Sequence, residues 1–325
     1  MLFRSLGLSV IVLSSANNLT QLFIGLLLTR GFGQASLSVV SITIVSNSHA
    51  KRNLGLAMAF YAILSLPFHL VLINSVGYGL NSLEWNWRWV TTLIGATVIL
   101  LSFSALFIPK FGRFSRRHPA EVSISKGDLE GIGIWDALAT PAFWLFGLTI
   151  SIWGMIYSGV ALFNQDIFHE RGFEKELYFR ILSFTSIVGL FSKFVFGWAM
   201  RYLSVSQLLG ISMLFTSLSL VGLPLASETW HAYLYGLMGG ISSGGIALLF
   251  FSCWGTLYGH RDLGKIQGVA QSLTILASAI GPVLFSTVKA SMNSYRPVFF
   301  ATAGIACILA MLSFVVPTPT DSNQS

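Results

Sequence analysis

Long apolar runs separated by short polar stretches recur along the whole chain. Ten runs fit membrane-spanning helices: residues 3–17, 19–45, 54–76, 88–108, 142–164, 177–199, 205–223, 231–252, 266–289 and 297–316. A helix needs about 20 apolar residues to cross the hydrocarbon core of a bilayer. Helices are the expected elements, because every backbone amide in hydrocarbon must be satisfied within its own segment. The pattern therefore predicts an all-α membrane protein with about ten transmembrane helices.

The longest polar segment interrupts this pattern at residues 109–140. It carries five Lys or Arg residues and four acidic residues, too many charges for a membrane span. We expect four parts as a result: an incomplete N-terminal bundle of four spans at 1–108, a cytoplasmic linker at 109–141, a six-helix C-terminal bundle at 142–316 and a cytoplasmic tail at 317–325.

Composition agrees with a membrane protein and excludes a soluble one. Charged residues make up 10% of the 325 positions, whereas a soluble domain carries about 25%. The net charge of +7 does not indicate nucleic-acid binding, because the basic residues stand singly or in pairs between apolar runs. Twelve basic residues are expected on the side of the membrane that holds the N-terminus, and six on the opposite side. This bias predicts that both termini are cytoplasmic, in a plasma membrane or a bacterial inner membrane.

The chain offers no constellation typical of an enzyme, a metal site or a cofactor site. Cys253 and Cys307 lie in or beside apolar runs without metal-ligand spacing. No glycine-rich loop follows a strand, and neither a zinc-binding HExxH motif nor an intramembrane protease arrangement is present. We therefore expect a protein that is not an enzyme and binds no cofactor. Its expected partners are a small solute and the lipid bilayer, and its oligomeric state is left open.

Several stretches resemble a known family: Arg30–Gln34, Ser46–Asn47 and Lys51–Met58, then Trp135–Trp144, then Leu263–Gly268 with Ser278–Pro282. They resemble the fourth and fifth, the seventh and the eleventh helices of major facilitator superfamily transporters, in particular the monocarboxylate and oxalate-formate porter-like branch. The resemblance implies two pseudo-symmetric helical bundles that open a central cavity to one side of the membrane and then to the other. In this alignment the chain begins at the family's third helix and lacks the first two.

Two basic residues are expected inside spans, while all twelve acidic residues fall in loops or at span ends. Arg30 lies about 16 Å into its span and Lys193 about 12 Å from the cytoplasmic end of its span, at 1.5 Å per residue. Lys193 also resembles a basic residue of monocarboxylate porters that engages the substrate carboxylate. Each cation could hold an anionic solute; alternatively, Arg30 fixes helix packing and Lys193 reaches toward the inner interface. The absence of a buried carboxylate favours an organic-anion uniporter or exchanger.

Uncharged polar residues supplement these cations. We expect Gln34, Tyr157 and Gln271 to help bind the solute, and His69 either to couple protons or to pack as a neutral side chain. Gln271 shares one helix face with Thr274 and Ser278, and that face could line a cavity or bond to a neighbouring helix. The glycine-rich run at 236–245 indicates close helix packing.

The sequence thus predicts a secondary active or facilitative transporter of a small solute, an organic anion such as a monocarboxylate. The binding residues would be Arg30, Lys193, Gln34, Tyr157 and Gln271. The alternative is a transport-inactive truncated remnant that acts as a membrane sensor or an assembly partner, or is a pseudogene product.

Overall fold

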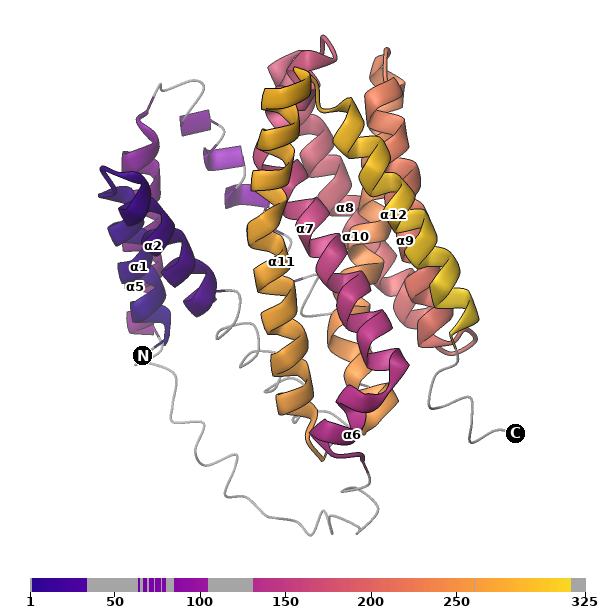
Figure 1. Ribbon diagram of the computed structural model, residues 1–325. Coiled ribbons are helices and arrows are strands. Elements are labelled where there is room, and N and C mark those ends of the chain that lie inside the picture. Colours follow the sequence, from indigo (N-terminus) through magenta and orange to yellow (C-terminus); the bar gives the residue numbers. More distant parts are fainter. Residues whose placement is uncertain are drawn as a thin grey trace. The chain divides into compact units, whose positions relative to one another are not determined.

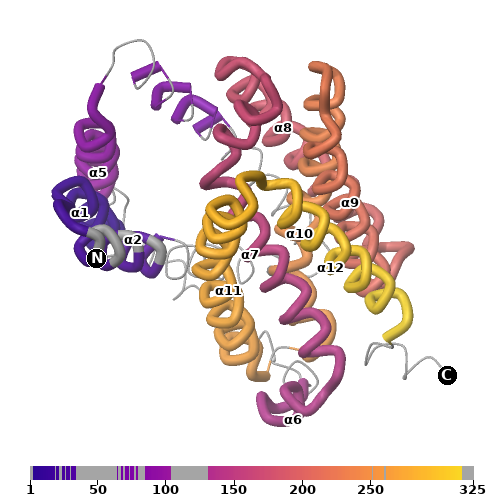
Figure 2. The backbone as a smooth tube through the Cα atoms, turned by 45° about the horizontal axis from the view of Figure 1, so that its top comes forward, coloured from indigo at the N-terminus to yellow at the C-terminus, as the bar shows by residue number. Residues whose placement is uncertain are grey.

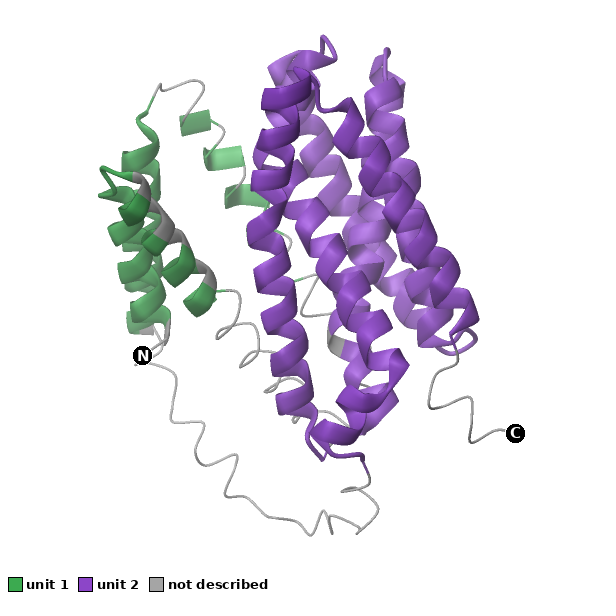
Figure 3. Ribbon diagram, viewed as in Figure 1, with its two compact units in different colours: residues 1–124 green, residues 125–325 purple. Residues whose placement is uncertain are grey.

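A computed structural model describes residues 2–33, 64, 67–68, 70–72, 74–76, 78–79, 85–104, 131–259 and 261–316. These residues are almost entirely helical, and no β-strand is formed among them. The chain divides into two compact units, residues 1–124 and 125–325 (Figure 3). This boundary lies within the predicted linker, whose residues 109–130 are outside the described ranges.

The first unit contains three described helices: α1 (Leu2–Ser14), α2 (Leu19–Arg30) and α5 (Trp87–Ser104). Helices α1 and α5 are antiparallel, because Arg4 lies 4.9 Å from the ring of Phe103 at one end while Thr92 Oγ1 and Ser14 Oγ are 2.9 Å apart at the other. Small residues let these two helices approach closely.

The second unit contains seven described helices: α6 (Ile134–Ala139), α7 (Pro141–Glu170), α8 (Lys175–Ala199), α9 (Val205–Leu225), α10 (Thr229–Tyr258), α11 (Leu263–Met292) and α12 (Arg296–Val315) (Figure 1). All of them except α6 are long and apolar enough to cross a membrane. The six C-terminal spans predicted from the sequence are therefore confirmed as helices. Helices α7 and α10 each continue six residues beyond the predicted end, because intrahelical hydrogen bonds do not stop where the apolar run stops.

The six long helices pack in a defined order. Helix α7 lies along α11, α10 lies between α8 and α9, and α9 lies along α12 (Figure 2). Glycine permits close approaches between these helices: a Cβ atom on Gly240 of α10 would stand 2.8 Å from the carbonyl oxygen of Thr185 on α8. The predicted packing role of the glycine-rich run is confirmed at this interface.

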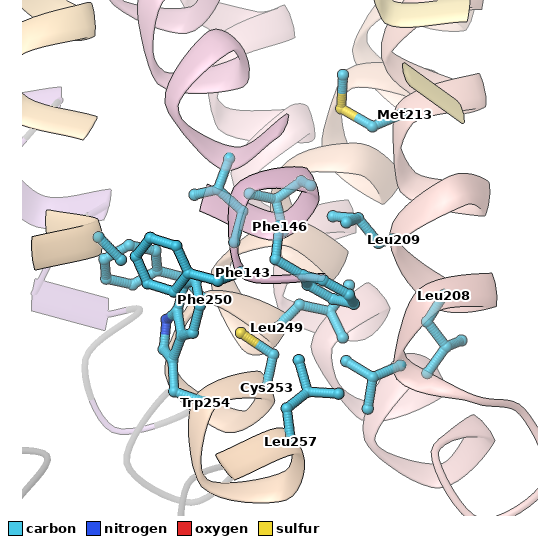
Figure 4. Close-up of a cluster of buried hydrophobic side chains, with 14 of the residues drawn as sticks. Phe143, Phe146, Leu208, Leu209, Met213, Leu249, Phe250, Cys253, Trp254 and Leu257 are labelled. Atoms are coloured by element: carbon cyan, nitrogen blue, oxygen red, sulfur yellow. The ribbon is translucent and has the colours of Figure 1, made fainter. Parts of the chain in front are cut away.

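Apolar side chains fill the centre of the second unit. Phe143 and Phe146 of α7 meet Leu209 and Met213 of α9, while Trp254 joins them from α10 (Figure 4). These five side chains are fully buried. Because they come from three helices, they fix the spacing of the bundle.

Hydrogen bonds connect the helix ends that lie away from α6. Glu170, at the end of α7, accepts from Lys289 Nζ of α11 at 2.6 Å and from Ser294 Oγ before α12 at 2.8 Å. Arg171 donates from Nε and Nη2 to the carbonyl oxygen of Ala226, at 3.1 and 2.7 Å. These contacts form a polar clasp around Glu170 and Arg171 that connects α7, α11, α12 and the end of α9.

At the other end of the unit, the short helix α6 is docked on the turn between α10 and α11. Asp262 Oδ2 accepts from the backbone N–H of Ile134 at 3.2 Å, and Asp262 Oδ1 lies 2.8 Å from Lys265 Nζ. Thr140 Oγ1 and Tyr258 Oη are hydrogen bonded at 2.7 Å. Part of the predicted linker is thus a helix fixed to the C-terminal bundle.

Candidate functional site

Polar side chains from three helices meet at one turn of α10, formed by Ile241 and Ser242. From α7, Trp153 Nε1 donates to Ser242 Oγ at 3.2 Å. From α8, Ser192 Oγ donates to the carbonyl oxygen of Ile241 at 2.7 Å. The two contacts place the middle of α7 and the C-terminal half of α8 at the same level of the bundle.

Lys193 follows Ser192 and is partly exposed. The α8 face that packs on α10 includes Gly189 and Ser192, whereas Phe191 and Val195 belong to an exposed apolar stripe. At about 100° per residue, Lys193 lies roughly 160° around the helix from Phe191 and Val195. It is therefore turned away from the stripe that is best suited to contact lipid.

The ammonium group of Lys193 has no hydrogen-bond or ion-pair partner within the described ranges. An unpaired cation at membrane depth is unfavourable unless water or an anion reaches it. The alternative, in which Lys193 reaches toward the inner interface, also stays a prediction. The arrangement is chemically suited to binding an anion.

Tyr157, one turn beyond Trp153 on α7, stacks on the Trp153 ring. The ring centroids are 5.0 Å apart and the ring planes differ by 12°. Tyr157 remains 52% exposed despite this stacking. An aromatic surface is therefore presented from α7 beside the α10 turn at Ile241 and Ser242.

Gln271 lies on α11 and is only 8% exposed. On the same face, Thr274 Oγ1 lies 3.3 Å from Ser151 Oγ of α7, and the Ser278 carbonyl oxygen accepts from Ser158 Oγ at 2.6 Å. Thr274 and Ser278 therefore serve helix packing. The Gln271 amide makes no hydrogen bond to the described part of the chain, so its predicted role in binding stays a prediction.

The other predicted site residues belong to the first unit. Arg30 is the last residue of α2, and a π-helical turn continues from it through Gly33. The side chain of Arg30, and the whole of Gln34 and His69, lie outside the described residues. The structure thus brings Ser192, the neighbour of Lys193, and Trp153 to the same turn of α10, with Tyr157 one turn further along α7. The roles of Arg30, Gln34 and His69 stay predictions.

Sequence reasoning missed Trp153, Ser242 and Thr216. Ser242 and Thr216 are both buried, and their hydroxyl oxygens are 2.5 Å apart. The four-residue spacing of Trp153 and Tyr157 could have indicated a stacked pair on one helix face. No sequence signal connects Ser242 with Trp153, because that contact depends on how α7 and α10 pack.

Comparison with known proteins identifies the fold. No protein-family model and no curated protein sequence matches the chain. Among solved structures, it is similar to a bacterial homologue of the human lysosomal transporter Spinster in an inward-facing and occupied conformation, with 13% identity and a TM-score of 0.61 over 97% of this chain and 80% of that one. It is also similar to the human organic anion transporter MFSD10 (TETRAN), with 15% identity and a TM-score of 0.60 over 96% of this chain and 75% of that one.

These similarities show that the chain has the all-α fold of major facilitator transporters. With six apolar helices in the second unit, the protein is a multi-pass integral membrane protein. At these levels of identity the similarity extends to the fold and not to the solute.

Proposed function

We propose that this protein is a membrane transporter of a small organic anion such as a monocarboxylate, working by alternating access. The observation that carries the proposal is Lys193, a cation in a span whose ammonium group has no partner within the described residues. The fold supports membrane transport, and one of the similar structures is an organic anion transporter. The assignment to the monocarboxylate and oxalate-formate porter-like branch belongs to the same proposal.

The chemistry of the site favours an anion over a cation or a neutral solute. A carboxylate that reaches Lys193 would relieve an unfavourable unpaired charge and form a charge-assisted hydrogen bond. No acidic residue lies in the central turns of α7 to α12 to neutralise Lys193 or to attract a cation. Arg30, Gln34, Tyr157 and Gln271 remain proposed as further binding residues, and His69 as a proton-coupling residue.

The test is anion uptake into proteoliposomes that contain the purified protein. We expect saturable uptake of a radiolabelled monocarboxylate, and we expect Lys193→Ala to raise its KM by about tenfold or more, the effect of losing one hydrogen bond to a charged group. Lys193→Arg should retain part of the affinity, because the positive charge remains.

Lys175→Ala is the matched control for this experiment. Lys175 is the same residue type on the same helix, but it is exposed at the first turn of α8. Its replacement should leave uptake unchanged. If Lys193→Ala takes up the anion with the KM of the unmodified protein, Lys193 does not bind the solute.

The alternative function, a transport-inactive membrane protein, makes a different prediction in the same assay. It predicts no saturable uptake of any carboxylate by protein that is folded and correctly inserted. Insertion can be checked by protease protection of the loops. Uptake that depends on Lys193 would exclude this alternative.

A further inference from the structure

The exposed aromatic surface of Trp153 and Tyr157 on α7 bears on the shape of the solute. This inference rests on the proposed function, because it concerns the substrate class of the same site. Tyr157 keeps 52% of its surface exposed while it stacks on Trp153 at 5.0 Å and 12°. A half-exposed tyrosine with a parallel ring behind it offers a flat surface for another ring.

Hydrogen bonds hold this aromatic surface in place. Trp153 Nε1 donates to Ser242 Oγ at 3.2 Å, and Ser242 Oγ is 2.5 Å from Thr216 Oγ1. Thr216 Oγ1 in turn donates to the carbonyl oxygen of Ser212 at 3.0 Å. This series of hydrogen bonds runs from α7 through α10 to α9. Its hydroxyl groups are buried, so few other hydrogen-bond partners are within their reach. The Trp153 ring, and with it Tyr157, is therefore fixed in orientation before a solute binds.

Lys193 and Trp153 belong to the same level of the bundle, and the Tyr157 ring begins one turn further along α7. Ser192, the neighbour of Lys193, bonds to Ile241, and Trp153 bonds to the adjacent Ser242. A carboxylate at Lys193 would thus have its attached group close to the level of the Trp153–Tyr157 stack. We infer that the site selects flat, conjugated carboxylates, such as benzoate-like anions, over short aliphatic or saturated cyclic acids.

The same chain contains an internal control for this surface. Trp198 and Tyr202 on the α8 side have the same four-residue spacing and the same 5.0 Å centroid separation. Their rings are tilted by 58°, and both side chains are mostly exposed, Trp198 in the last turn of α8 and Tyr202 in the turn that follows it. Tyr202→Leu therefore removes an equivalent ring without touching the Lys193 level.

The experiment compares three anions: benzoate, cyclohexanecarboxylate of similar size but without a flat ring, and acetate. KM values are measured by uptake into proteoliposomes, and benzoate binding is measured independently by saturation-transfer NMR on the purified protein. We expect the unmodified protein to prefer benzoate over cyclohexanecarboxylate by about threefold to tenfold, the size of one aromatic stacking contact. Tyr157→Leu should abolish that preference, whereas Tyr202→Leu should keep it. Size-exclusion chromatography of both variants shows that they are folded.

Ser242 is proposed as a positioning residue, so its test needs a readout beyond stability. Ser242→Ala should raise the KM for benzoate by about threefold while the maximal rate and the KM for acetate stay unchanged. Ser242→Thr keeps the hydroxyl and should restore the KM for benzoate. Equal effects of Ser242→Ala on benzoate and acetate would contradict the positioning role.

The outcomes separate this inference from the proposed function. Equal KM values for benzoate and cyclohexanecarboxylate, or equal effects of Tyr157→Leu and Tyr202→Leu, overturn the aromatic selectivity and leave anion transport standing. Benzoate binding that depends on Tyr157, without uptake of any anion, overturns transport and supports the aromatic site. The absence of both binding and uptake overturns both.

Discussion

Glu170 shows at the scale of single residues how a partly exposed charge can still contribute to stability. Its carboxylate accepts from Lys289 at 2.6 Å and from Ser294 at 2.8 Å. The Glu170 and Lys289 side chains are 24% and 34% exposed, so solvent weakens their attraction only in part. The Lys289 ammonium group also lies 5.0 Å from the Tyr295 ring.

We predict that Glu170→Gln lowers the free energy of unfolding by about 1 kcal/mol, because the carboxylate is replaced by a neutral group of the same shape. The measurement is thermal unfolding of the protein in detergent. Glu176→Gln is the control, since the Glu176–Arg180 pair is 3.4 Å long with side chains 79% and 68% exposed. Comparable losses in both variants would show that the network around Glu170 adds nothing to an ordinary surface pair.

The residue scale also shows what the sequence could and could not predict about the site. The positions of Lys193 and Tyr157 inside spans followed from hydropathy alone. The direction in which Lys193 points required the pattern of exposure on α8, and the Trp153–Ser242 bond required the packing of α7 against α10. Gln271 lies on the expected face with Thr274, but that face packs on α7, because hydroxyls in hydrocarbon bond to the nearest helix.

At the scale of elements, the pairing of α8 with α10 depends on glycine. A Cβ atom on Gly240 would stand 2.7 Å from Val188 Cβ and 2.8 Å from the carbonyl oxygen of Thr185. Backbone atoms cannot move aside as a flexible side chain can. Any larger residue at position 240 must therefore push α8 and α10 apart.

We predict that Gly240→Leu destabilises the protein by about 1–3 kcal/mol or prevents its folding, because overpacking forces two helices apart. Gly304→Leu on α12 is the control, because a Cβ atom there meets nothing within 4 Å. Expression level and monodispersity by size-exclusion chromatography report the outcome. A Gly240→Leu protein as stable as the Gly304→Leu protein would contradict the role of close packing.

Sequence patterns predicted the elements of the second unit better than their ends. The six spans were recognisable because an apolar run of this length has few alternatives. The sequence did not indicate the helix α6 within the linker. The helix-start signals there, Thr140 as a cap and Pro141 in the first turn, belong to the following helix α7. A six-residue helix has too few residues for a periodic pattern, and tertiary contacts such as Asp262 with Ile134 decide whether it forms.

At the scale of the whole molecule, the docking of α6 ties the linker to the C-terminal bundle. The Lys265 ammonium group and the Ile134 N–H both favour the ionised form of Asp262, so the pKa of this carboxyl is lowered from its ordinary value. A carboxyl with a lowered pKa in the folded state contributes stability above its unfolded pKa, near 3.9, and loses it as the pH falls through the folded value. The docking is therefore complete at neutral pH and weakens in acid.

We predict that Asp262→Asn reproduces this loss at neutral pH. The backbone amide of Ile134 should exchange with deuterium faster in the variant, because its acceptor no longer carries a charge. Hydrogen exchange of residues 131–139 followed by mass spectrometry is the measurement. Asp166→Asn, exposed on the far part of α7, should leave this segment unchanged. Unaltered exchange in Asp262→Asn would mean that packing alone docks α6.

The polar clasp around Glu170 and Arg171 has a consequence for the surrounding lipid. It connects the ends of α7, α9, α11 and α12, so none of these helices can slide along its own axis without breaking hydrogen bonds. A mismatch between their apolar length and the bilayer must then be met by tilting the four together or by deforming the lipid. Bilayer thickness is therefore expected to act on this unit as a whole, with short-chain and long-chain lipids shifting its preferred tilt in opposite directions.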